Sequence, residues 1–342
     1  MEIKENIFSV ADLYDTFFID MYGVLFDGSE LYNGTLDTLK KLKEIGKKIV
    51  LVSNTSQLSA DAMRGYTERG MNRGIHYDHF VTAGELLHRI LLHRPDIFSS
   101  QIGKEINTVK CLFMGNVNVF KDTGISVADT YKEADLVYVA SPRAHYGSVR
   151  IDNLYDENGN KIKTEEFLDK DWKTLRDDQG RQGLAEFALQ LEKLSALGKT
   201  LFLSNPDVFA PFKIDDGKHP VATQGAIGSY YEKVFGGKVL YFGKPFVEIF
   251  EFAKKVSSSE NDKILMIGDT LWTDVLGAHN SGMDSALVMT GVSGEFFRSM
   301  TGKHITEKLD ILANQIGPKL SCAKQNLKNP THILRHFYGN LG

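Results

Sequence analysis

The feature that most constrains the fold is an alternation of short apolar runs and helix-type patterns near both ends of the chain. The first apolar run, Thr16 to Ile19, is followed by apolar residues at three-residue steps from Leu36 to Ile45. Gly46 then provides a helix C-cap signal. A second run, Lys48 to Val52, precedes a helical pattern that continues to Gly70. Strand and helix in this order predict parallel βαβ units with right-handed crossovers.

The same alternation returns in the C-terminal half of the chain. The two halves together therefore predict one Rossmann-like core with a parallel sheet, built from two separate stretches of sequence. The predicted strands of this half are Val239–Phe242, Ile264–Ile267 and Ala286–Met289, and the predicted helices are Phe246–Val256 and Thr273–Asn280.

A long segment, residues 87–219, separates the two halves. It contains strand-type runs and a helical pattern of its own, so we interpret it as an inserted α/β domain. The core domain is then predicted to comprise residues 1–86 and 220–312. The runs in the insert are Val109–Met114, Leu136–Ala140 and Thr200–Leu203, and its helical pattern is Leu184–Leu197.

The C-terminal tail, residues 313–342, contains basic residues and no acidic residue. Apolar residues recur in it at helical spacing, which predicts a terminal helix docked on the core. The alternative is a weak peripheral anchor for a membrane or a partner. The apolar residues are Ile333, Leu334, Phe337, Tyr338 and Leu341.

The composition is typical of a folded globular protein, with 42% hydrophobic and 25% charged residues. A net charge of −4 argues against a nucleic-acid binder, because such proteins usually carry a strong basic excess. Two cysteines, Cys111 and Cys322, are too few for a disulfide framework. The N-terminus lacks the apolar run of a signal peptide, and no apolar stretch is long enough to cross a bilayer. We therefore expect a cytoplasmic protein.

Four predicted strands end in residues that can carry chemistry: Asp20, Ser53, Lys244 and Asp269. In open parallel sheets the carboxyl ends of the strands form the functional edge, so these side chains are expected to converge. Two carboxylates brought together repel each other, and Mg²⁺, which prefers oxygen ligands, relieves that repulsion. A carboxylate, a metal and a lysine are the groups that phosphoryl transfer requires, because negative charge spreads over the transferred phosphoryl oxygens.

The sequence around these positions resembles the four motifs of the haloacid dehalogenase (HAD) superfamily. The resemblance is strongest to its class IIA phosphatases, of the chronophin and NagD type. It implies a HAD core with an inserted class II (C2) cap, which closes the site, selects the substrate and is a candidate homodimer surface. The matching segments are Asp20-Met21-Tyr22-Gly23-Val24, Val52-Ser53-Asn54, Gly243-Lys244-Pro245, Gly268 to Asp274 and, for the class, Ser204-Asn205-Pro206-Asp207.

The resemblance implies a nucleophile and a metal site. Asp20 would be the nucleophile, forming an aspartyl-phosphate, and also a Mg²⁺ ligand. The backbone carbonyl of Tyr22 and the side chain of Asp269 would complete the protein ligands. Asp274 would orient metal-bound water.

The resemblance also implies a phosphate site. Ser53 and Asn54 would hold the phosphate oxygens, and Lys244 would stabilise their charge. Asn205 and Asp207 have two readings: they shape a turn around Pro206, or they act between cap and core or on the substrate.

One residue departs from the family pattern. The family usually has a second aspartate two positions after the nucleophile, where this chain has Tyr22. A tyrosine, with a pKa of about 10, is a poor general base near neutral pH. We therefore expect a Mg²⁺-dependent phosphatase that favours aryl phosphates such as phosphotyrosine, on a small molecule or a phosphoprotein. The alternatives are a sugar, nucleotide or pyridoxal phosphatase, or a weak pseudo-enzyme that binds a partner.

Overall fold

The computed structural model describes residues 2–114, 118–128, 130, 132–139, 191–214, 217–313, 327 and 329–339. The predicted helix Leu184–Leu197 lies partly outside this range, and residues 191–196 of it are helical. Most of the basic C-terminal tail also lies outside the described residues.

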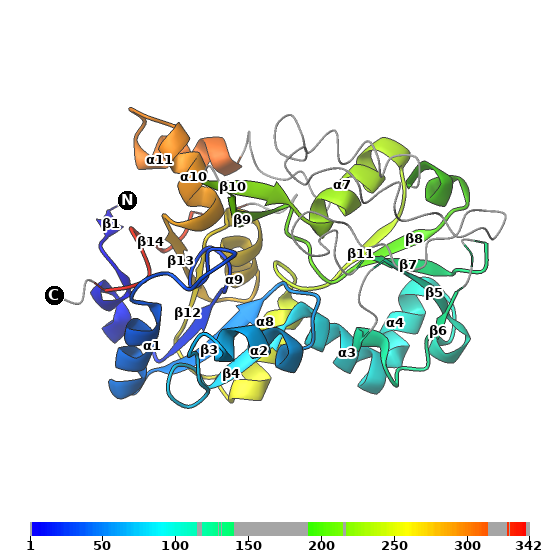
Figure 1. The fold of residues 1–342 in the computed structure, drawn as a ribbon, viewed down its shortest axis with the longest axis horizontal. Helices are drawn as coiled ribbons and strands as arrows, with labels where there is room; N and C mark the ends of the chain where they lie inside the picture. The colour runs from blue at the N-terminus through cyan, green and yellow to red at the C-terminus, as the bar shows by residue number, and fades with distance from the viewer. Residues whose placement is uncertain are drawn as a thin grey trace.

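The larger sheet has seven strands, and every pairing between neighbours is parallel. Helices cover both of its faces (Figure 1). The core strands predicted at both ends of the chain, apart from Val239–Phe242, are present in this sheet. In spatial order the strands are β1 (Ile3–Lys4), β14 (His332–Leu334), β13 (Asp284–Val288), β12 (Ile264–Gly268), β2 (Thr16–Ile19), β3 (Lys48–Ser53) and β4 (His79–Thr82).

The central strands are continuous apolar runs because both faces of the sheet are covered. Phe17 and Ile19 of β2 pack into the cluster that contains Leu39 of α1, whereas Phe18 packs with Phe250 of α8 on the opposite face. The helices of this half are α1 (Thr35–Glu44), α2 (Ser59–Thr67), α3 (Ala83–His93), α8 (Val247–Ser257), α9 (Leu276–Asn280), α10 (Gly291–Ser299) and α11 (Ile305–Ile311).

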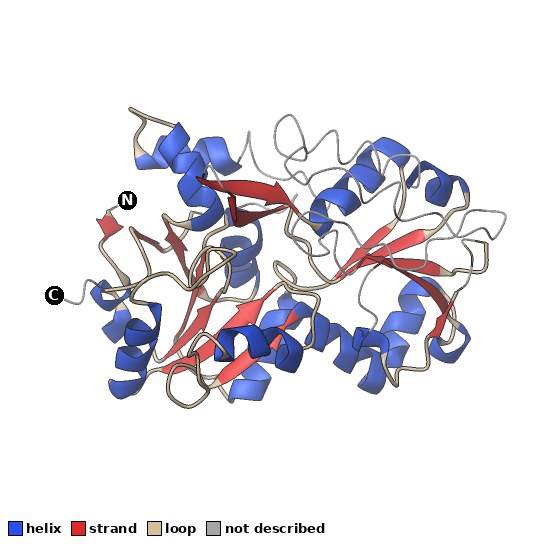
Figure 2. Cartoon of the chain, in the orientation of Figure 1, coloured by secondary structure: helices blue, strands red, loops and turns tan. Residues whose placement is uncertain are grey.

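A second sheet of five parallel strands lies at the other end of the molecule (Figure 2). An antiparallel hairpin of β9 (Phe209–Ile214) and β10 (Gly217–Ala222) follows its strand β8 and lies against α10. The sheet order is β11 (Val239–Tyr241), β8 (Thr200–Leu203), β7 (Leu136–Val139), β5 (Lys110–Met114) and β6 (Ser126–Val127), accompanied by α4 (Pro95–Ile102) and α7 (Gln224–Phe235).

The assignment of the strand Val239–Phe242 to the core is wrong. This strand, β11, pairs in parallel with β8 of the second sheet. Tyr231 of the preceding helix α7 packs in the same cluster as Leu201 and Leu203 of β8. The apolar run identifies a strand, but its length and composition do not say which of two parallel sheets it joins.

The prediction of a helix in the C-terminal tail is also wrong for the described residues. His332–Leu334 form β14, which pairs with β13 and β1. Ile333 and Leu334 pack into different clusters, and both are fully buried, as is Phe337. These side chains are therefore part of the core and not an exposed anchor for a membrane. Leu341 lies outside the described residues.

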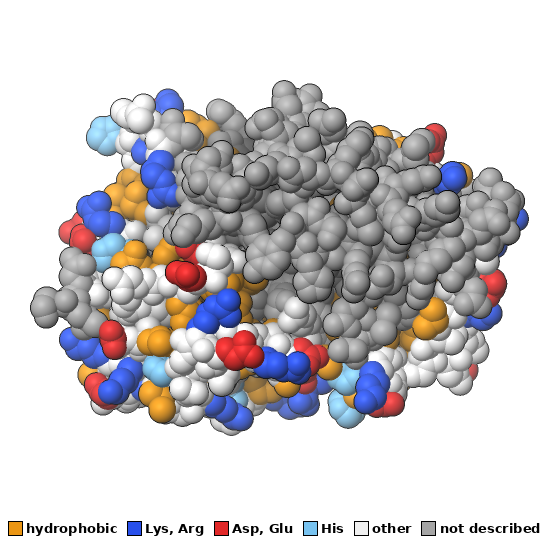
Figure 3. All heavy atoms as spheres, viewed as in Figure 1, with side chains coloured by type: hydrophobic (Ala, Val, Ile, Leu, Met, Phe, Trp, Pro, Cys, Tyr) orange, Lys and Arg blue, Asp and Glu red, His pale blue; other side chains and the backbone are white. Residues whose placement is uncertain are grey.

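Two surface properties follow from the described residues. Acidic and basic side chains are interspersed on the visible surface at the end of the molecule that contains the seven-stranded sheet (Figure 3). None of the described helices combines the length and the apolar character needed to cross a bilayer.

Candidate active site

The predicted strand-end residues converge at the carboxyl edge of the main sheet. Asp20 follows β2, Ser53 ends β3 and Asp269 follows β12, and these three strands are neighbours in the sheet. Lys244 follows β11 and reaches the same place from the second sheet. Its Nζ lies 2.7 Å from Asp20 Oδ1 and 2.7 Å from Asp274 Oδ1. The ammonium group is 1% exposed, so both ion pairs are buried.

The carboxylate of Asp269 is held in a cradle of backbone. The amide of Val292 donates a hydrogen bond to Asp269 Oδ2 at 2.6 Å. Gly23 and Gly291 have φ of +81° and +58°, and a Cβ added to either would lie 2.1 or 2.0 Å from the same oxygen. Because neither glycine has a side chain, the carboxylate can lie directly against the loop that follows Asp20.

Asp274 is positioned by a π-helical turn, Leu271–Val275, which precedes α9. The sequence predicted an ordinary helix start at Thr273. Asp274 Oδ1 accepts a hydrogen bond from Lys244, and Oδ2 accepts from the amide and the hydroxyl of Thr270 at 3.1 and 2.9 Å. Both oxygens are thus engaged by the protein, which suits a residue that orients water better than a direct metal ligand.

The carboxylates fit a divalent cation. Oxygens of Asp20, Asp269 and Asp274 all lie within 4.8 Å of one another. Lys244 contacts Asp20 Oδ1 and the Val292 amide contacts Asp269 Oδ2, and none of the described residues donates a hydrogen bond to the other oxygen of either carboxylate. These two atoms are hard oxygen ligands of the kind Mg²⁺ prefers. Ligation by the Tyr22 carbonyl stays a prediction.

The electrostatics of the site favour the same conclusion. Burial raises the pKa of Asp20 to about 7, with help from the charges of Asp274 and Asp207 and against the opposing effect of Lys244. Burial, together with the charges of Asp20 and Asp274, raises the pKa of Asp269 well above its usual range. Burial acts to lower the pKa of Lys244, but the surrounding carboxylates outweigh it and raise that pKa. Negative charge exceeds positive charge here, and a bound cation would balance it.

Asn54 holds the lysine turn. Its Oδ1 accepts from the Lys244 amide at 2.6 Å, and its Nδ2 donates to the Lys244 carbonyl at 3.0 Å and to Asp207 Oδ1 at 3.2 Å. Gly243 has φ of +110° and lies against the same carboxamide. The carboxamide of Asn54 is thus engaged in positioning Lys244 and Asp207, and the predicted role of Asn54 in binding phosphate stays a prediction. The phosphate role of Ser53, whose buried Oγ accepts from the Thr55 amide at 3.3 Å, stays a prediction.

Asn205 and Asp207 show both of the behaviours considered for them. Asn205 Oδ1 accepts from the Asp207 amide at 3.0 Å, which shapes the turn around Pro206. Asp207 extends from this turn to Asn54 and also accepts a hydrogen bond from the Thr273 side chain. Asp207, which follows β8 of the second sheet, thus places its carboxylate at the carboxyl edge of the main sheet.

Tyr22 lies in an aromatic cluster. Its ring packs edge-on against Phe26 with centroids 5.2 Å apart, and Phe26 packs edge-on against Tyr66 of α2 at 5.3 Å. The Tyr22 side chain is also hydrogen-bonded to Tyr66, and burial together with this bond raises the pKa of Tyr66 well above its usual range. The position at which the family carries a second aspartate is therefore occupied by a tethered ring.

Several residues of the site were not predicted from the sequence. Val292 contributes only its backbone amide, so its side chain carries no signal. Tyr66 occupies a buried position of an amphipathic helix, so its sequence pattern indicates a core residue and not a site residue. Thr270 lies inside a recognised motif and could have been considered as a partner of Asp274.

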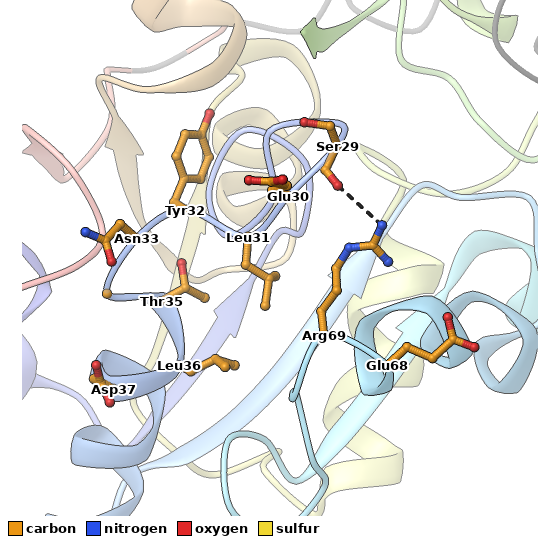
Figure 4. A pocket seen from close by; sticks show the side chains of 11 residues that line it. Ser29, Glu30, Leu31, Tyr32, Asn33, Thr35, Leu36, Asp37, Glu68 and Arg69 are labelled. Atoms are coloured by element: carbon orange, nitrogen blue, oxygen red, sulfur yellow. Dashed lines mark hydrogen bonds between the residues drawn. The ribbon is translucent and has the colours of Figure 1, made fainter.

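A hollow lined by Ser29–Asp37, Glu68 and Arg69 flanks this region (Figure 4). Arg69 closes one side of it by donating to the Ser29 carbonyl at 3.3 Å. Tyr32 lines the hollow and is hydrogen-bonded to the Gly291 backbone beside the Asp269 cradle. The hollow contains none of the residues predicted for the active site.

Two family models match the chain. A haloacid dehalogenase-like hydrolase model matches residues 17–122, and a HAD-hydrolase-like model matches residues 241–315. The first range contains Asp20 and Ser53, and the second contains Lys244 and Asp269.

Two relatives and one solved structure illustrate the similarity. The 4-nitrophenylphosphatase of Schizosaccharomyces pombe is 29% identical, over 86% of this chain and 88% of the relative. Chronophin of Bos taurus is 26% identical, over 80% of each chain. The crystal structure of a haloacid dehalogenase-like hydrolase from Brucella suis 1330 has a TM-score of 0.65 at 19% identity, covering 98% of this chain and 100% of that one, and so supports the fold alone.

Proposed function

From the premise that this chain belongs to the haloacid dehalogenase-like hydrolases, in class IIA, we propose that it hydrolyses phosphomonoesters with Mg²⁺ through an aspartyl-phosphate on Asp20. One observation carries the proposal. The buried ammonium of Lys244 lies 2.7 Å from Asp20 Oδ1, beside a second buried carboxylate, Asp269. In this proposal Asp20 is the nucleophile, Lys244 is the counter-charge for phosphate and Asp269 is a metal ligand.

The residues divide the chemistry as follows. Lys244 keeps its proton, because neighbouring carboxylates raise its pKa, and so offers a fixed positive charge to the phosphoryl oxygens. The carboxylate of Asp20 attacks phosphorus. Mg²⁺, when bound, neutralises charge on the phosphoryl group and on the carboxylates. Asp20, Asp269 and the Tyr22 carbonyl would hold it, and Asp274 would orient water beside it.

Aryl phosphates are the proposed preferred substrates, including phosphotyrosine in a peptide or a small aryl ester. The support is the tethered ring of Tyr22, which leaves no carboxylic acid directly beside the nucleophile. A phenol has a pKa of about 10, so its anion departs more readily than an alkoxide. One relative is named for such a substrate, 4-nitrophenyl phosphate.

The second sheet is the proposed C2 cap. We propose that it begins near residue 87, as predicted from the sequence, and ends near residue 241 instead of 219. The later end follows because β11 pairs with β8 of the second sheet and α7 packs against that sheet. Dimerisation through this domain stays a prediction.

The test is turnover of 4-nitrophenyl phosphate by the full chain with Mg²⁺, with EDTA, and with Mg²⁺ restored. Asp20→Asn should abolish turnover, because the amide is a poor nucleophile of nearly the same size. Asp12→Asn is the control, since Asp12 is an exposed carboxylate on the same N-terminal segment. Turnover that persists in EDTA, or in folded Asp20→Asn protein, contradicts the proposal. A wild-type chain without turnover on any phosphomonoester would favour the binding-module alternative.

A further inference from the structure

The proposed reaction lacks a residue that exchanges a proton with the leaving group. The Tyr22 ring is packed against Phe26, and its side chain is hydrogen-bonded to Tyr66. Asp269 and Asp274 are committed to the cradle and to Lys244. A general acid for leaving groups poorer than phenols must therefore come from elsewhere.

Asp207 is a carboxylate close to the site for which the mechanism has no use. It lies in the chain between β8 of the second sheet and the hairpin that begins with β9. The Thr223 hydroxyl and the Gly225 amide both donate to its backbone carbonyl, the latter at 3.0 Å. A Cβ on Gly225 would lie 2.1 Å from the Pro206 carbonyl, so the two segments are packed together. The backbone of Asp207 is thus fixed on the side of the second sheet.

The side chain of Asp207 reaches the phosphate site from that side. Its Oδ1 lies 3.2 Å from Asn54 Nδ2, on the same carboxamide that binds both backbone groups of Lys244. Attack by Asp20 places the leaving oxygen on the far side of phosphorus, because the attacking and leaving oxygens are in line. Asp20 belongs to the main sheet, so the leaving oxygen faces the second sheet, from which Asp207 comes.

We propose that Asp207 is the general acid and base of this phosphatase, in place of the aspartate that Tyr22 replaces. This inference rests on the proposed function. In the first step an oxygen of the Asp20 carboxylate bonds to phosphorus, the bond from phosphorus to the ester oxygen breaks, and that oxygen takes the proton of the Asp207 carboxyl. In the second step the Asp207 carboxylate takes a proton from water, the water oxygen bonds to phosphorus, and the bond from phosphorus to Asp20 breaks, which frees the Asp20 carboxylate. The products are the alcohol and orthophosphate, and both carboxyl groups return to their initial states.

The surroundings of Asp207 suit proton exchange. The charged groups around it are Lys244, which favours its ionised form, and Asp20, Asp269 and Asp274, which favour its protonated form. Burial raises the pKa of Asp207 to about 6, although Lys244 opposes the change. A carboxyl with such a pKa retains a protonated fraction near neutral pH, as a general acid requires.

The alternative is that Asp207 has only a structural role, in which its hydrogen bonds to Asn54 and Thr273 hold the segment after β8 against the main sheet. Asp207→Asn separates the two roles, because an amide oxygen still accepts from Asn54 and Thr273 but the side chain has no acidic proton. Asp207→Glu keeps the proton and should restore part of the activity. Asp96→Asn is the control. Asp96 is an exposed carboxylate in α4, and its only ion pair among the described residues is with Arg94.

The experiment measures kcat/KM with Mg²⁺ for phenyl phosphate esters of graded acidity and for an alkyl ester such as glycerol phosphate. In Asp207→Asn we expect the alkyl ester to lose on the order of 100-fold, the range of general acid catalysis, and 4-nitrophenyl phosphate to lose less than about 3-fold. In the wild type, kcat/KM for the alkyl ester should fall as the pH rises through the pKa of Asp207, and this fall should be absent in Asp207→Asn.

Equal losses for all substrates, with the pH dependence unchanged, would overturn the role of Asp207 and leave the proposed function intact. A wild-type chain that hydrolyses none of the esters would overturn both. Circular dichroism and thermal unfolding of each variant show whether a loss comes from misfolding, and the pH profile of the wild type tests the inference without any variant.

Discussion

The cluster of buried carboxylates makes the stability of the metal-free protein depend on pH in an unusual direction. Most aspartates have lowered pKa values in folded proteins and add stability as the pH rises. Asp20 has a raised pKa, so its protonated form is the one that favours folding. Its contribution is fully present below the unfolded pKa of about 3.8 and is lost as the pH rises through the folded pKa of about 7.

The magnitude follows from the two pKa values. A change of one pKa unit corresponds to about 1.36 kcal/mol, so the step from 3.8 to about 7 corresponds to about 4 kcal/mol. Asp207 and Asp274 interact with Asp20, so part of this figure is shared with them and must not be counted again. We therefore expect a loss of about 3 to 4 kcal/mol between pH 4 and pH 7.5 from this cluster.

The assay is urea unfolding in EDTA at a series of pH values, for the wild type and for Asp20→Asn. Other groups titrate in both proteins, so the difference between the two free energies of unfolding isolates Asp20. Relative to Asp20→Asn, the wild type should lose about 3 to 4 kcal/mol as the pH rises, and Mg²⁺ at pH 7.5 should stabilise the wild type more than the variant. Parallel pH profiles, or equal stabilisation by Mg²⁺, would show that the carboxylates are not coupled as described.

Three further outcomes are expected. Gly291→Ala should weaken Mg²⁺ binding measured by calorimetry at least 10-fold, because its Cβ would lie 2.0 Å from Asp269 Oδ2, while unchanged affinity would refute the cradle. Tyr22→Asp should raise kcat/KM for alkyl phosphates relative to 4-nitrophenyl phosphate, and a constant ratio would show that Tyr22 does not set the preference. Phe337→Ala should lower the free energy of unfolding by about 3 to 5 kcal/mol, because this ring is fully buried, whereas a change below 1 kcal/mol would place the C-terminal segment outside the core.

The sequence predicted the strands of the main sheet well because they are buried on both faces. Continuous apolar runs such as Thr16–Ile19 and Ile264–Ile267 have no other common interpretation in a chain with this alternation. The polar residues after them also fell where expected, because the ends of neighbouring parallel strands share one edge. Asp20, Lys244 and Asp269 were therefore brought together as predicted.

The errors have a different cause, since each depends on contacts between distant parts of the chain. Ile333 and Phe337 have helical spacing, but a three-residue strand between two others also buries consecutive apolar residues. The run at Val239–Phe242 could join either sheet. The positioning role of the Asn54 carboxamide was not predicted, because it depends on hydrogen bonds to Lys244, 190 positions away, which no local pattern encodes.

Asn54 connects the two parts of the catalytic apparatus. Asn54 directly follows β3 of the main sheet, yet its carboxamide binds Lys244 after β11 and Asp207 after β8, in two segments that leave the second sheet. A displacement of the second sheet that pulled either segment would break a hydrogen bond to the same side chain. The charge proposed to stabilise phosphate and the proposed proton donor are therefore positioned by one carboxamide.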